Sequence, residues 1–319
     1  MTGRVQFLGE GLDADGTLSQ RLLEMGCEVG EFDPERALGE QIGDADVVLL
    51  RDGPLGEAEF SSARRLKLVQ RTGVHVYGVD MAAAAAHGVA VSYVPSQFNP
   101  GQAVAEHTLY LLLALAKRAR VCQRSVEKQL VGEPTTMLLA GKTLGLVGMG
   151  RIGREMIGLA KAIGMDVVGI RQTTYPGLAD ALHVRWLGGL GDLHELLAVS
   201  DVVSLHIPAS AANAGLIGAA EIAKMRQGAL LLNTARAALI DYPAVVEGVS
   251  SGWLGALGMD VWWSEPADPA DPLLQFENVI LTPHVGGAAE GARRGVVEVV
   301  AENVRRAMSG EPVRFLAHA

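Results

Sequence analysis

The fold is decided by a stretch that reads Thr143-Leu144-Gly145-Leu146-Val147-Gly148-Met149-Gly150-Arg151-Ile152-Gly153. Its first five residues have the length and apolar character of a buried strand, and the glycines follow at once. Residues 151–163 then carry apolar side chains three and four positions apart, which predicts an amphipathic helix. Gly164 can cap that helix, and residues 166–170 form a second strand-like run. The stretch therefore predicts one complete βαβ unit.

The glycines of this unit have the spacing found in dinucleotide-binding turns. Gly148 would make the tight turn, Gly150 would let the backbone approach a pyrophosphate, and Gly153 would let the helix pack closely on the strand. Arg151 and Ile152 would open the helix, whose first N–H groups can hold phosphates. The spacing alone is weak, because the chain has 39 glycines among 319 residues. Its strand-helix-strand frame is what predicts a bound dinucleotide.

The end of the second strand bears on which dinucleotide is bound. A site for NAD usually has an acidic residue there, which hydrogen-bonds the ribose 2′-hydroxyl. This chain reads Gly169-Ile170-Arg171-Gln172-Thr173-Thr174, without a carboxylate. Because a guanidinium can bind a 2′-phosphate through two hydrogen bonds, Arg171 favours NADP (NADPH) over NAD. The alternative is that Arg171 is a solvated surface residue and that the choice of cofactor is relaxed.

Apolar runs of strand length alternate with helical patterns along the whole chain. These runs cover residues 5–8, 47–50, 66–70, 89–92, 144–147, 166–170, 202–206, 229–233, 255–260 and 279–281. Strands that are apolar throughout and separated by helices are typical of parallel sheets covered on both faces. The predicted fold class is therefore α/β with doubly wound parallel sheets.

Two breaks divide this pattern. A turn-rich segment at residues 95–101 precedes a long helix over about 102–120, whose apolar middle predicts burial. Near the end, residues 283–287 interrupt the pattern before a final helix over about 288–308. The length of 319 residues also fits two domains of ordinary size.

Composition narrows the classes of partner. The formal net charge is −9, so nucleic acids and anionic membranes would repel the chain. Its longest apolar stretch, residues 109–116, is shorter than the roughly 20 residues that a membrane span needs. Cys27 and Cys122 are far apart and lack metal-ligand spacing, which predicts a reducing compartment and no metal site. We expect a cytoplasmic protein without nucleic-acid or membrane partners.

Three side chains with useful chemistry follow predicted strands downstream of the βαβ unit. They are Arg236, Glu265 and His284. Residues just past the carboxyl ends of parallel strands face the ligand crevice of such folds. There an arginine can bind an anion, a glutamate can orient an imidazole, and a histidine can exchange a proton. Each residue alone has an ordinary structural explanation, but together with a dinucleotide unit they indicate a hydride-transfer enzyme.

At this point the chain resembles the D-isomer-specific 2-hydroxyacid dehydrogenases over most of its length. The resemblance rests on the glycine unit with its lead-in at residues 141–145, on Ala103-Val104-Ala105-Glu106-His107, and on residues 200–208. It also rests on Arg236, Glu265 and His284, which occur in the order of the family with spacings of 29 and 19 residues.

The resemblance implies a role for each of these residues. His284 would exchange a proton with the substrate oxygen, and Glu265 would hydrogen-bond its imidazole and stabilise the protonated form. Arg236 would bind the substrate carboxylate, and Asp260 would hold the nicotinamide carboxamide. The remaining cofactor contacts would come from His206, Pro208 and Thr234.

The resemblance also implies how the chain is assembled. A Rossmann-type dinucleotide-binding domain, residues 100–287, would be inserted into a flavodoxin-like substrate domain formed by residues 1–99 and 288–319. A small 2-oxo or D-2-hydroxy acid would bind between them, with backbone groups near Val74 and His75 holding its carboxylate. His75 replaces a glycine of the family, so its side chain would either contact the substrate or point to solvent. The chain would form a homodimer around the long helix.

Two other functions remain open at this stage. A nicotinamide-binding sensor, similar to a corepressor, could use the same fold without turnover, although it would not need the acid/base pair Glu265 and His284. Formate oxidation is the second alternative. The relatives that catalyse it pair their histidine with glutamine, so Glu265 disfavours this reaction.

Overall fold

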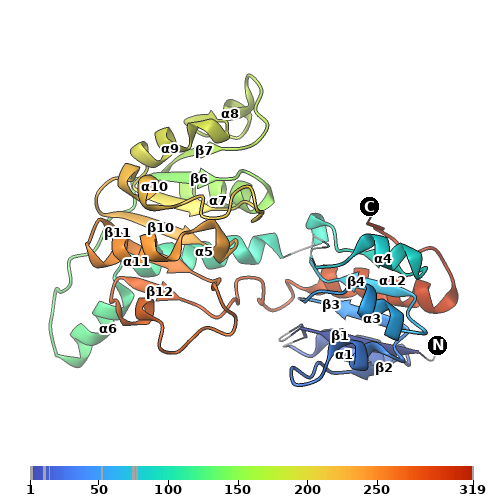
Figure 1. The fold of residues 1–319 in the computed structure, drawn as a ribbon. Helices are drawn as coiled ribbons and strands as arrows, with labels where there is room; N and C mark the ends of the chain where they lie inside the picture. Colours follow the sequence, from blue (N-terminus) through green and yellow to red (C-terminus); the bar gives the residue numbers. More distant parts are fainter. Residues whose placement is uncertain are drawn as a thin grey trace. The chain divides into compact units, whose positions relative to one another are not determined.

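The structure of the chain is a computed structural model that describes residues 3–9, 12–13, 15–51, 53–73, 76, 78–98 and 100–317. The chain divides into two compact units, residues 1–100 with 290–319 and residues 101–289. The domain limits expected from the sequence, after residues 99 and 287, lie one and two residues before these divisions. Each unit contains one parallel sheet with helices packed against it (Figure 1).

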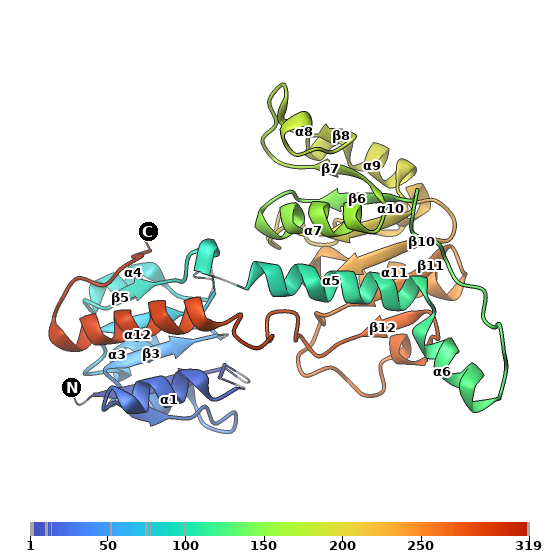
Figure 2. The ribbon, with the colours of Figure 1, turned by 180° about the vertical axis from the view of Figure 1, so that it is seen from behind.

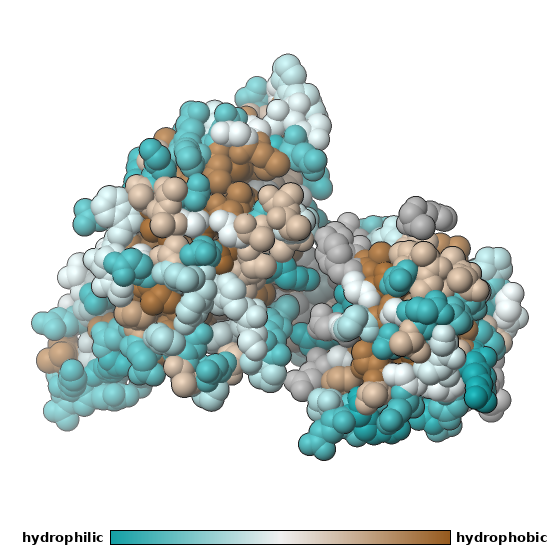
Figure 3. Space-filling model, viewed as in Figure 1, coloured by the Kyte–Doolittle hydropathy of each residue, from teal (hydrophilic) through white to brown (hydrophobic). Residues whose placement is uncertain are grey.

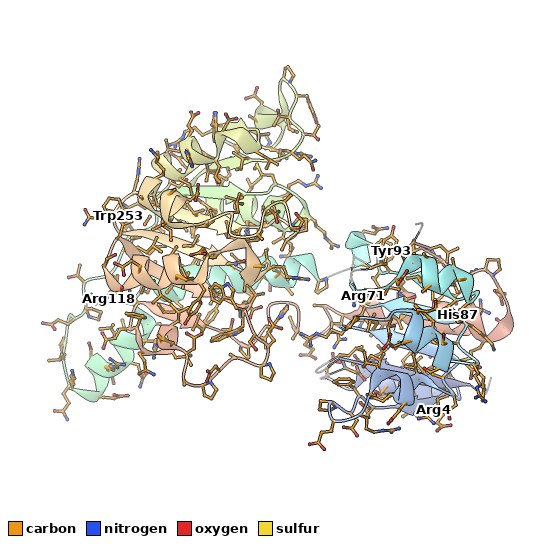
Figure 4. All side chains as sticks on the ribbon, in the orientation of Figure 1. Arg4, Arg71, His87, Tyr93, Arg118 and Trp253 are labelled. Carbon is orange, nitrogen blue, oxygen red and sulfur yellow. The ribbon has the colours of Figure 1, made fainter. Side chains whose placement is uncertain are left out.

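The first unit is built on a five-stranded sheet. Its strands are β1 (Arg4–Leu8), β2 (Glu28–Gly30), β3 (Val47–Leu50), β4 (Leu68–Arg71) and β5 (Ala90–Ser92). They lie in the order β2-β1-β3-β4-β5 and all pairs are parallel, which is the order of flavodoxin-like sheets. Figure 4 labels Arg71, the last residue of β4.

Helices cover both faces of this first sheet. Helices α1 (Thr17–Glu24) and α12 (Arg294–Ser309) share one hydrophobic cluster with it, as their position together in Figure 2 shows. Helices α2 (Leu38–Ile42), α3 (Glu57–Ser62) and α4 (Met81–Ala86) share the other cluster. A short 3-10 turn, η1 (Ser96–Phe98), follows β5. The last helix of the chain therefore returns to pack with the first strands.

The second unit is built on a seven-stranded sheet. Its strands are β6 (Thr143–Val147), β7 (Asp166–Ile170), β8 (Trp186–Gly188), β9 (Val202–Leu205), β10 (Ala229–Asn233), β11 (Leu254–Met259) and β12 (Val279–Leu281). They lie in the order β12-β11-β10-β9-β6-β7-β8, again all parallel. The order reverses between β6 and β9, and ligands of doubly wound sheets bind at such a reversal, outside the carboxyl ends of the strands.

The faces of this second sheet are also covered. Helices α5 (Gly101–Ala116) and α7 (Arg151–Ala162) share one hydrophobic cluster and lie side by side in Figure 2. Helices α9 (Leu193–Val199), α10 (Ala219–Lys224) and α11 (Tyr242–Ser250) share the other. The shorter elements are α6 (Ala119–Glu127), α8 (Leu178–Ala181), η2 (Leu190–Asp192), η3 (Ala237–Leu239) and η4 (Pro272–Gln275). The predicted α/β class with two doubly wound parallel sheets is confirmed.

Three details of the predicted elements were wrong. The long helix expected over 102–120 ends at Ala116, because Arg118 adopts a left-handed conformation (φ 51°) and α6 then starts in a new direction (Figure 4). The final helix begins at Arg294 rather than near residue 288, after Gly291 takes a positive φ of 71°. Strands β2 and β8 were not predicted, since each is three residues long and contains a glycine.

On the face shown in Figure 3, hydrophilic residues cover most of the area and apolar residues occur in separate patches. Several large exposed apolar side chains belong to α6 and the segment after it: Val126, Leu130, Val131 and Leu138. In the described part of the chain, every helix is too short or too polar to cross a membrane.

Candidate active site

The turn between β6 and α7 is shaped by its glycines. Gly148 has a φ of 102°, and an added Cβ there would lie 2.6 Å from the carbonyl oxygen of His206. An added Cβ on Gly153 would overlap the carbonyl oxygen of Gly148. Around Gly150, by contrast, no described heavy atom beyond the chain neighbours lies within 4 Å of the added Cβ position. The first and third glycines are thus required by packing within the unit, while the second leaves open space.

The start of α7 has polar backbone groups but no side-chain cap. The helix begins at Arg151 with Gly150 as N-cap, and a glycine has no side chain that could accept a hydrogen bond from the first N–H groups of the helix. The first N–H groups of a helix have no partner inside it and carry a partial positive charge. An anion such as a pyrophosphate can fill this place. Ile152 follows Arg151 in the first turn, and the Arg151 side chain lies against Gly101 at the start of α5.

His206 lies beside this turn, after β9. Its Nε2 is 2.9 Å from the Ser204 hydroxyl, and its backbone N–H donates to the carbonyl of Val147. Burial lowers the pKa of His206 to about 4, so the imidazole is neutral at neutral pH. Pro208, two residues further on, is exposed, and its carbonyl accepts a hydrogen bond from Asn213. His206 is therefore uncharged at neutral pH and contacts the Ser204 hydroxyl.

Thr234 joins the end of β10 to the long helix. Its hydroxyl lies 2.8 Å from the Thr108 hydroxyl of α5, and both residues are buried. Thr108 in turn donates to the carbonyl of Val104, one helical turn earlier. Since Thr108 uses its proton there, Thr234 is the donor of the bond between the two threonines. Thr234 is therefore already anchored on α5.

Arg171 follows directly after β7. Its backbone N–H donates to the carbonyl of Gly188. The side chain is partly exposed, and within the described parts of the chain its guanidinium has no hydrogen bond or ion pair. By comparison, Arg185, on the neighbouring segment, is paired with Asp166 at 3.0 Å. Arg171 thus presents a cation at the end of the strand, and no carboxylate of a described residue pairs with it.

Arg236 stands in a turn that one buried side chain organises. Asn233, the last residue of β10 and fully buried, accepts from the N–H of Ala235 and donates to the carbonyl of Arg236. Arg236 itself is exposed, and its guanidinium donates to the Ala235 carbonyl at 2.7 Å. Asn233 was not among the site residues predicted from the sequence. The sequence marks Asn233 by its place at the end of an apolar run, because a buried amide there needs hydrogen-bond partners.

Glu265 and His284 are brought together. His284 Nδ1 lies 2.9 and 2.8 Å from the two carboxylate oxygens of Glu265. The two side chains are about one third exposed. The loop of Glu265 is also tied to the turn of His284, because the Trp262 indole donates to the carbonyl of Thr282 at 2.9 Å. His284 has a φ of 57°, a conformation that is uncommon for a residue with a side chain.

Asp260 follows β11 and is buried with 2 % of its surface exposed. Its oxygens accept from the N–H groups of Val285 and Gly286 at 2.9 and 2.7 Å and from the Thr282 hydroxyl at 2.6 Å. Burial by itself would raise the pKa of Asp260. Hydrogen bonds from His107, Thr282, Gly286 and Val285 outweigh burial and hold the pKa below its ordinary value. Asp260 is therefore a carboxylate wrapped by the turn that carries His284.

The predicted site residues do not all fall in the described part of the chain. Val74 and His75, expected near the substrate carboxylate, lie outside the described residues. Within the ranges that the structure does describe, no group of three or more histidine, cysteine, aspartate or glutamate side chains could hold a metal ion. The arrangement at the carboxyl edge of the second sheet offers an anion-binding helix start, a cation after β7, and a carboxylate–imidazole pair. Groups of this kind can bind a dinucleotide and move a proton.

Comparisons with known proteins agree with this interpretation of the edge. The model of the "D-isomer specific 2-hydroxyacid dehydrogenase, NAD binding domain" family matches residues 109–286. The chain is similar to the glyoxylate reductase of Korarchaeum cryptofilum, with 32% identity over 87% of this chain and 84% of the relative. It is also similar to the D-3-phosphoglycerate dehydrogenase of Methanocaldococcus jannaschii, with 34% identity over 89% of this chain and 55% of the relative. The chain thus spans about half the length of the phosphoglycerate dehydrogenases that it matches.

Solved structures give the same picture. The TT0316 protein of Thermus thermophilus is 33% identical, with a TM-score of 0.84 over 99% of this chain and all of the other. The D-lactate dehydrogenase of Escherichia coli is 26% identical, with a TM-score of 0.84 over the full length of both chains.

Proposed function

The chain belongs to the D-isomer specific 2-hydroxyacid dehydrogenase family, and from this premise we propose that it transfers a hydride between NAD(P)H and a small 2-oxo acid. The product of reduction would be a D-2-hydroxy acid. The observation that supports this proposal most is the pairing of His284 Nδ1 with both carboxylate oxygens of Glu265 in the unit that also contains the dinucleotide turn. A cofactor sensor without turnover has no use for such a pair.

His284 would carry the proton of the reaction. With Nδ1 held by Glu265, the ring presents Nε2, which has no partner among the described residues, to a substrate oxygen. The bound nicotinamide would supply the hydride to the carbonyl carbon. His284 Nε2–H would then donate its proton to the carbonyl oxygen, and the Glu265 carboxylate would stabilise the imidazolium before that step. In the reverse direction, the neutral imidazole would accept the hydroxyl proton.

Arg236 would orient the acid for this transfer. Its guanidinium is exposed at the same edge of the sheet and lacks a carboxylate partner among the described residues. A guanidinium binds a carboxylate through two parallel hydrogen bonds, which fixes both position and rotation of the substrate. We propose that the first unit is the substrate domain and that Val74 and His75, which lie outside the described residues, belong to the residues that bind the substrate carboxylate. Residues 101–289 would be the cofactor domain.

The cofactor would lie across the turn after β6. Gly148, Gly150 and Gly153 would let the pyrophosphate reach the N–H groups at the start of α7, near Arg151 and Ile152. His206, Pro208 and Thr234 would line the same edge on the other side of the strand-order reversal. Asp260 Oδ2 accepts a hydrogen bond from the Gly286 N–H and retains the capacity to accept another from the nicotinamide carboxamide.

We propose that Arg171 makes NADPH the preferred cofactor. A charge-assisted contact with the 2′-phosphate contributes about 1.5 to 3 kcal/mol, or roughly 10- to 100-fold in kcat/KM. Arg171→Asp should lose that factor with NADPH and gain relative efficiency with NADH, while Arg185→Asp, which breaks a pair elsewhere, should not change the ratio. Equal efficiency of the wild type with the two cofactors would contradict this preference.

One assay tests the proposed reaction as a whole. The absorbance of NADPH is followed with a panel of 2-oxo acids that includes glyoxylate, hydroxypyruvate, pyruvate and longer or branched acids. Turnover of at least one is expected, and it should be lost in His284→Ala and show a sharply raised KM in Arg236→Ala. Tight NADPH binding without turnover of any acid would instead favour the sensor. An unchanged KM in Arg236→Ala would remove the carboxylate assignment.

We also propose a cytoplasmic homodimer. The exposed apolar residues Val126, Leu130, Val131 and Leu138 lie on α6 and the segment after it, beyond the long helix α5. Burying such side chains between two copies would remove apolar surface from water. Light scattering should give twice the mass of one chain, and Val131→Asp together with Leu138→Asp should shift the protein towards the monomer. A monomeric wild type would contradict the proposal.

A further inference from the structure

The turn that presents His284 is closed by one carboxylate. Asp260 Oδ1 accepts from the Val285 N–H and the Thr282 hydroxyl, and Oδ2 accepts from the Gly286 N–H. These donors flank His284 on both sides. Since His284 sits in a left-handed conformation, the turn has to be held by its surroundings. The position of the imidazole therefore depends on where the Asp260 carboxylate lies.

The Asp260 carboxylate is held by hydrogen bonds whose directions follow from the single proton of the Thr282 hydroxyl. The hydroxyl lies 2.6 Å from Asp260 Oδ1 and 3.4 Å from the carbonyl of Met259, so its single proton is donated to the carboxylate. His107 Nε2 is 2.9 Å from the same hydroxyl oxygen. Because that oxygen has already used its proton, it can only accept from His107. The imidazole of His107 must therefore carry its proton on Nε2.

The same N–H reaches the carboxylate itself. His107 Nε2 is 3.3 Å from Asp260 Oδ1, so one proton is shared between the threonine oxygen and the carboxylate. The site is tightly filled, because an added Cβ on Gly286 would lie 2.8 Å from Asp260 Oδ2 and 3.5 Å from His107 Cδ2. His107 is 15% exposed and its ring is 5.6 Å from the ring of Tyr110, centroid to centroid. Among the described residues, the hydrogen bonds from helix α5 to the His284 turn thus come from the His107 Nε2–H.

We propose that His107 is a positioning residue of the active site: its Nε2–H on α5 fixes Thr282 and Asp260, and these hold the turn that presents His284. The inference rests on the proposed role of His284 in proton transfer. His107 lies in the second turn of α5 and is separated from Thr282 by 175 positions in the sequence. Its effect on the reaction passes through the turn, without any contact with the substrate.

The test uses the full chain and three variants. His107→Phe keeps a ring of similar size and removes the donor. His107→Gln places an amide nitrogen near the position of Nε2 and can donate again. Glu106→Gln changes an exposed neighbour on the same helix and serves as the control. For each protein, kcat and KM are measured with NADPH and the best 2-oxo acid, and NADPH binding and Tm are measured separately.

A displaced catalytic group affects kcat more than binding. His107→Phe should lower kcat by about 10- to 100-fold, as expected for a displacement of the imidazole by up to about 1 Å. The KM for the acid and the Kd for NADPH should stay within about threefold of the wild type, and His107→Gln should recover most of the lost kcat. An unchanged kcat in His107→Phe, or an equal loss in the Phe and Gln variants, would overturn the proposal.

A second measurement needs no active variant. Nitrogen-15 NMR of the histidine rings in the wild type reports which ring nitrogen carries the proton, and the signals missing from His107→Gln identify His107. A proton on Nε2 supports the proposal, whereas a bare Nε2 contradicts it even where His107→Phe fails to fold. A wild type that turns over no 2-oxo acid would remove the proposed function itself. An active wild type with an insensitive His107 would remove only this inference.

Discussion

Two turns at the carboxyl edge of the second sheet differ in the hydrogen-bond acceptors of their backbone N–H groups. After β6, the N-cap of α7 is Gly150, which offers no side chain to the first N–H groups of the helix, and no described atom beyond its chain neighbours lies within 4 Å of an added Cβ on Gly150. After β12, the N–H groups of Val285 and Gly286 donate to the buried carboxylate of Asp260. The first turn leaves donors for an anion from outside, and the second is satisfied by an anion of the protein. The turn after β6, here called the open turn, is suited to binding. The turn after β12, here called the closed turn, is suited to holding a side chain in place.

The two histidines near these turns differ in the same sense. His206, beside the open turn, lies near a hydroxyl, and its pKa is lowered to about 4 by burial. His284, in the closed turn, is partly exposed and has a carboxylate on Nδ1. A neutral imidazole suits a wall of the cofactor site, whereas an imidazole beside a carboxylate can take up and release a proton. His206 is therefore a structural histidine, whereas His284 is the candidate acid/base.

The largest effect on cofactor binding is expected from a change in the glycine turn after β6. Gly153→Ala would place a methyl group on the Gly148 carbonyl oxygen, which is backbone and cannot move aside easily. NADPH binding should weaken by about 100-fold and the free energy of unfolding should fall by about 1 to 3 kcal/mol. Calorimetric titration and chemical unfolding measure the two quantities.

Gly158→Ala is the matched control on the same helix. Gly158 is exposed and an added Cβ meets nothing within 4 Å. The control should raise the free energy of unfolding by about 0.5 to 1 kcal/mol through helix propensity, with NADPH binding unchanged. Similar losses of NADPH affinity in the two variants would mean that the glycine turn does not form the binding site.

A smaller effect should separate the two histidines by pH. The pKa of His206 is about 4 in the folded chain and 6.5 in the unfolded reference, so unfolding takes up a proton between these values. Its stabilising contribution is complete above pH 6.5 and is lost as the pH falls towards 4. A difference of this size corresponds to roughly 3 kcal/mol, which partial solvent access of the ring reduces to about 2.

The measurement compares wild type and His206→Gln by chemical unfolding from about pH 7 to about pH 4. All other titrating groups are common to both proteins, so the difference between the two curves reports His206. The wild type should lose about 2 kcal/mol more than the variant over this range. Parallel curves would show that His206 is not held neutral by burial.

The smallest expected effect concerns the closed turn. Gly286→Ala would press a methyl group against Asp260 Oδ2, which lies 2.8 Å from the added Cβ position. A small displacement of the carboxylate should lower kcat by about tenfold while the Kd for NADPH stays within about threefold. Val285→Ala, which trims an exposed side chain and keeps the N–H donor, should leave kcat within about twofold. A Gly286→Ala enzyme with wild-type kcat would contradict the link between Asp260 and His284.

Much of the fold could be predicted from the sequence because parallel strands are apolar on both faces. Strands β3, β7, β10 and β12 have the limits expected from their apolar runs. The two missed strands, β2 and β8, have three residues each and end in a glycine, so neither shows the uninterrupted apolar run that marks β12, which is equally short.

The candidate site residues were easier to predict than the hydrogen bonds that position them. Arg236, Glu265 and His284 could be named because each follows a strand of a parallel sheet. The hydrogen bond between His107 and Thr282 joins residues 175 positions apart, and a single sequence does not show which distant polar groups meet. Asp260 was assigned to the cofactor alone, since its three donors belong to a turn whose shape only the structure shows.

A single-turnover experiment tests the central claim most directly. Wild type and His284→Ala are each loaded with one equivalent of NADPH, glyoxylate or the best acid of the panel is added, and the decay of NADPH absorbance is followed. The account predicts equal NADPH binding by both proteins, rapid oxidation by the wild type, and oxidation slowed by about 100- to 10,000-fold in His284→Ala. Oxidation by His284→Ala at the wild-type rate would contradict the claim that the closed turn holds the proton donor.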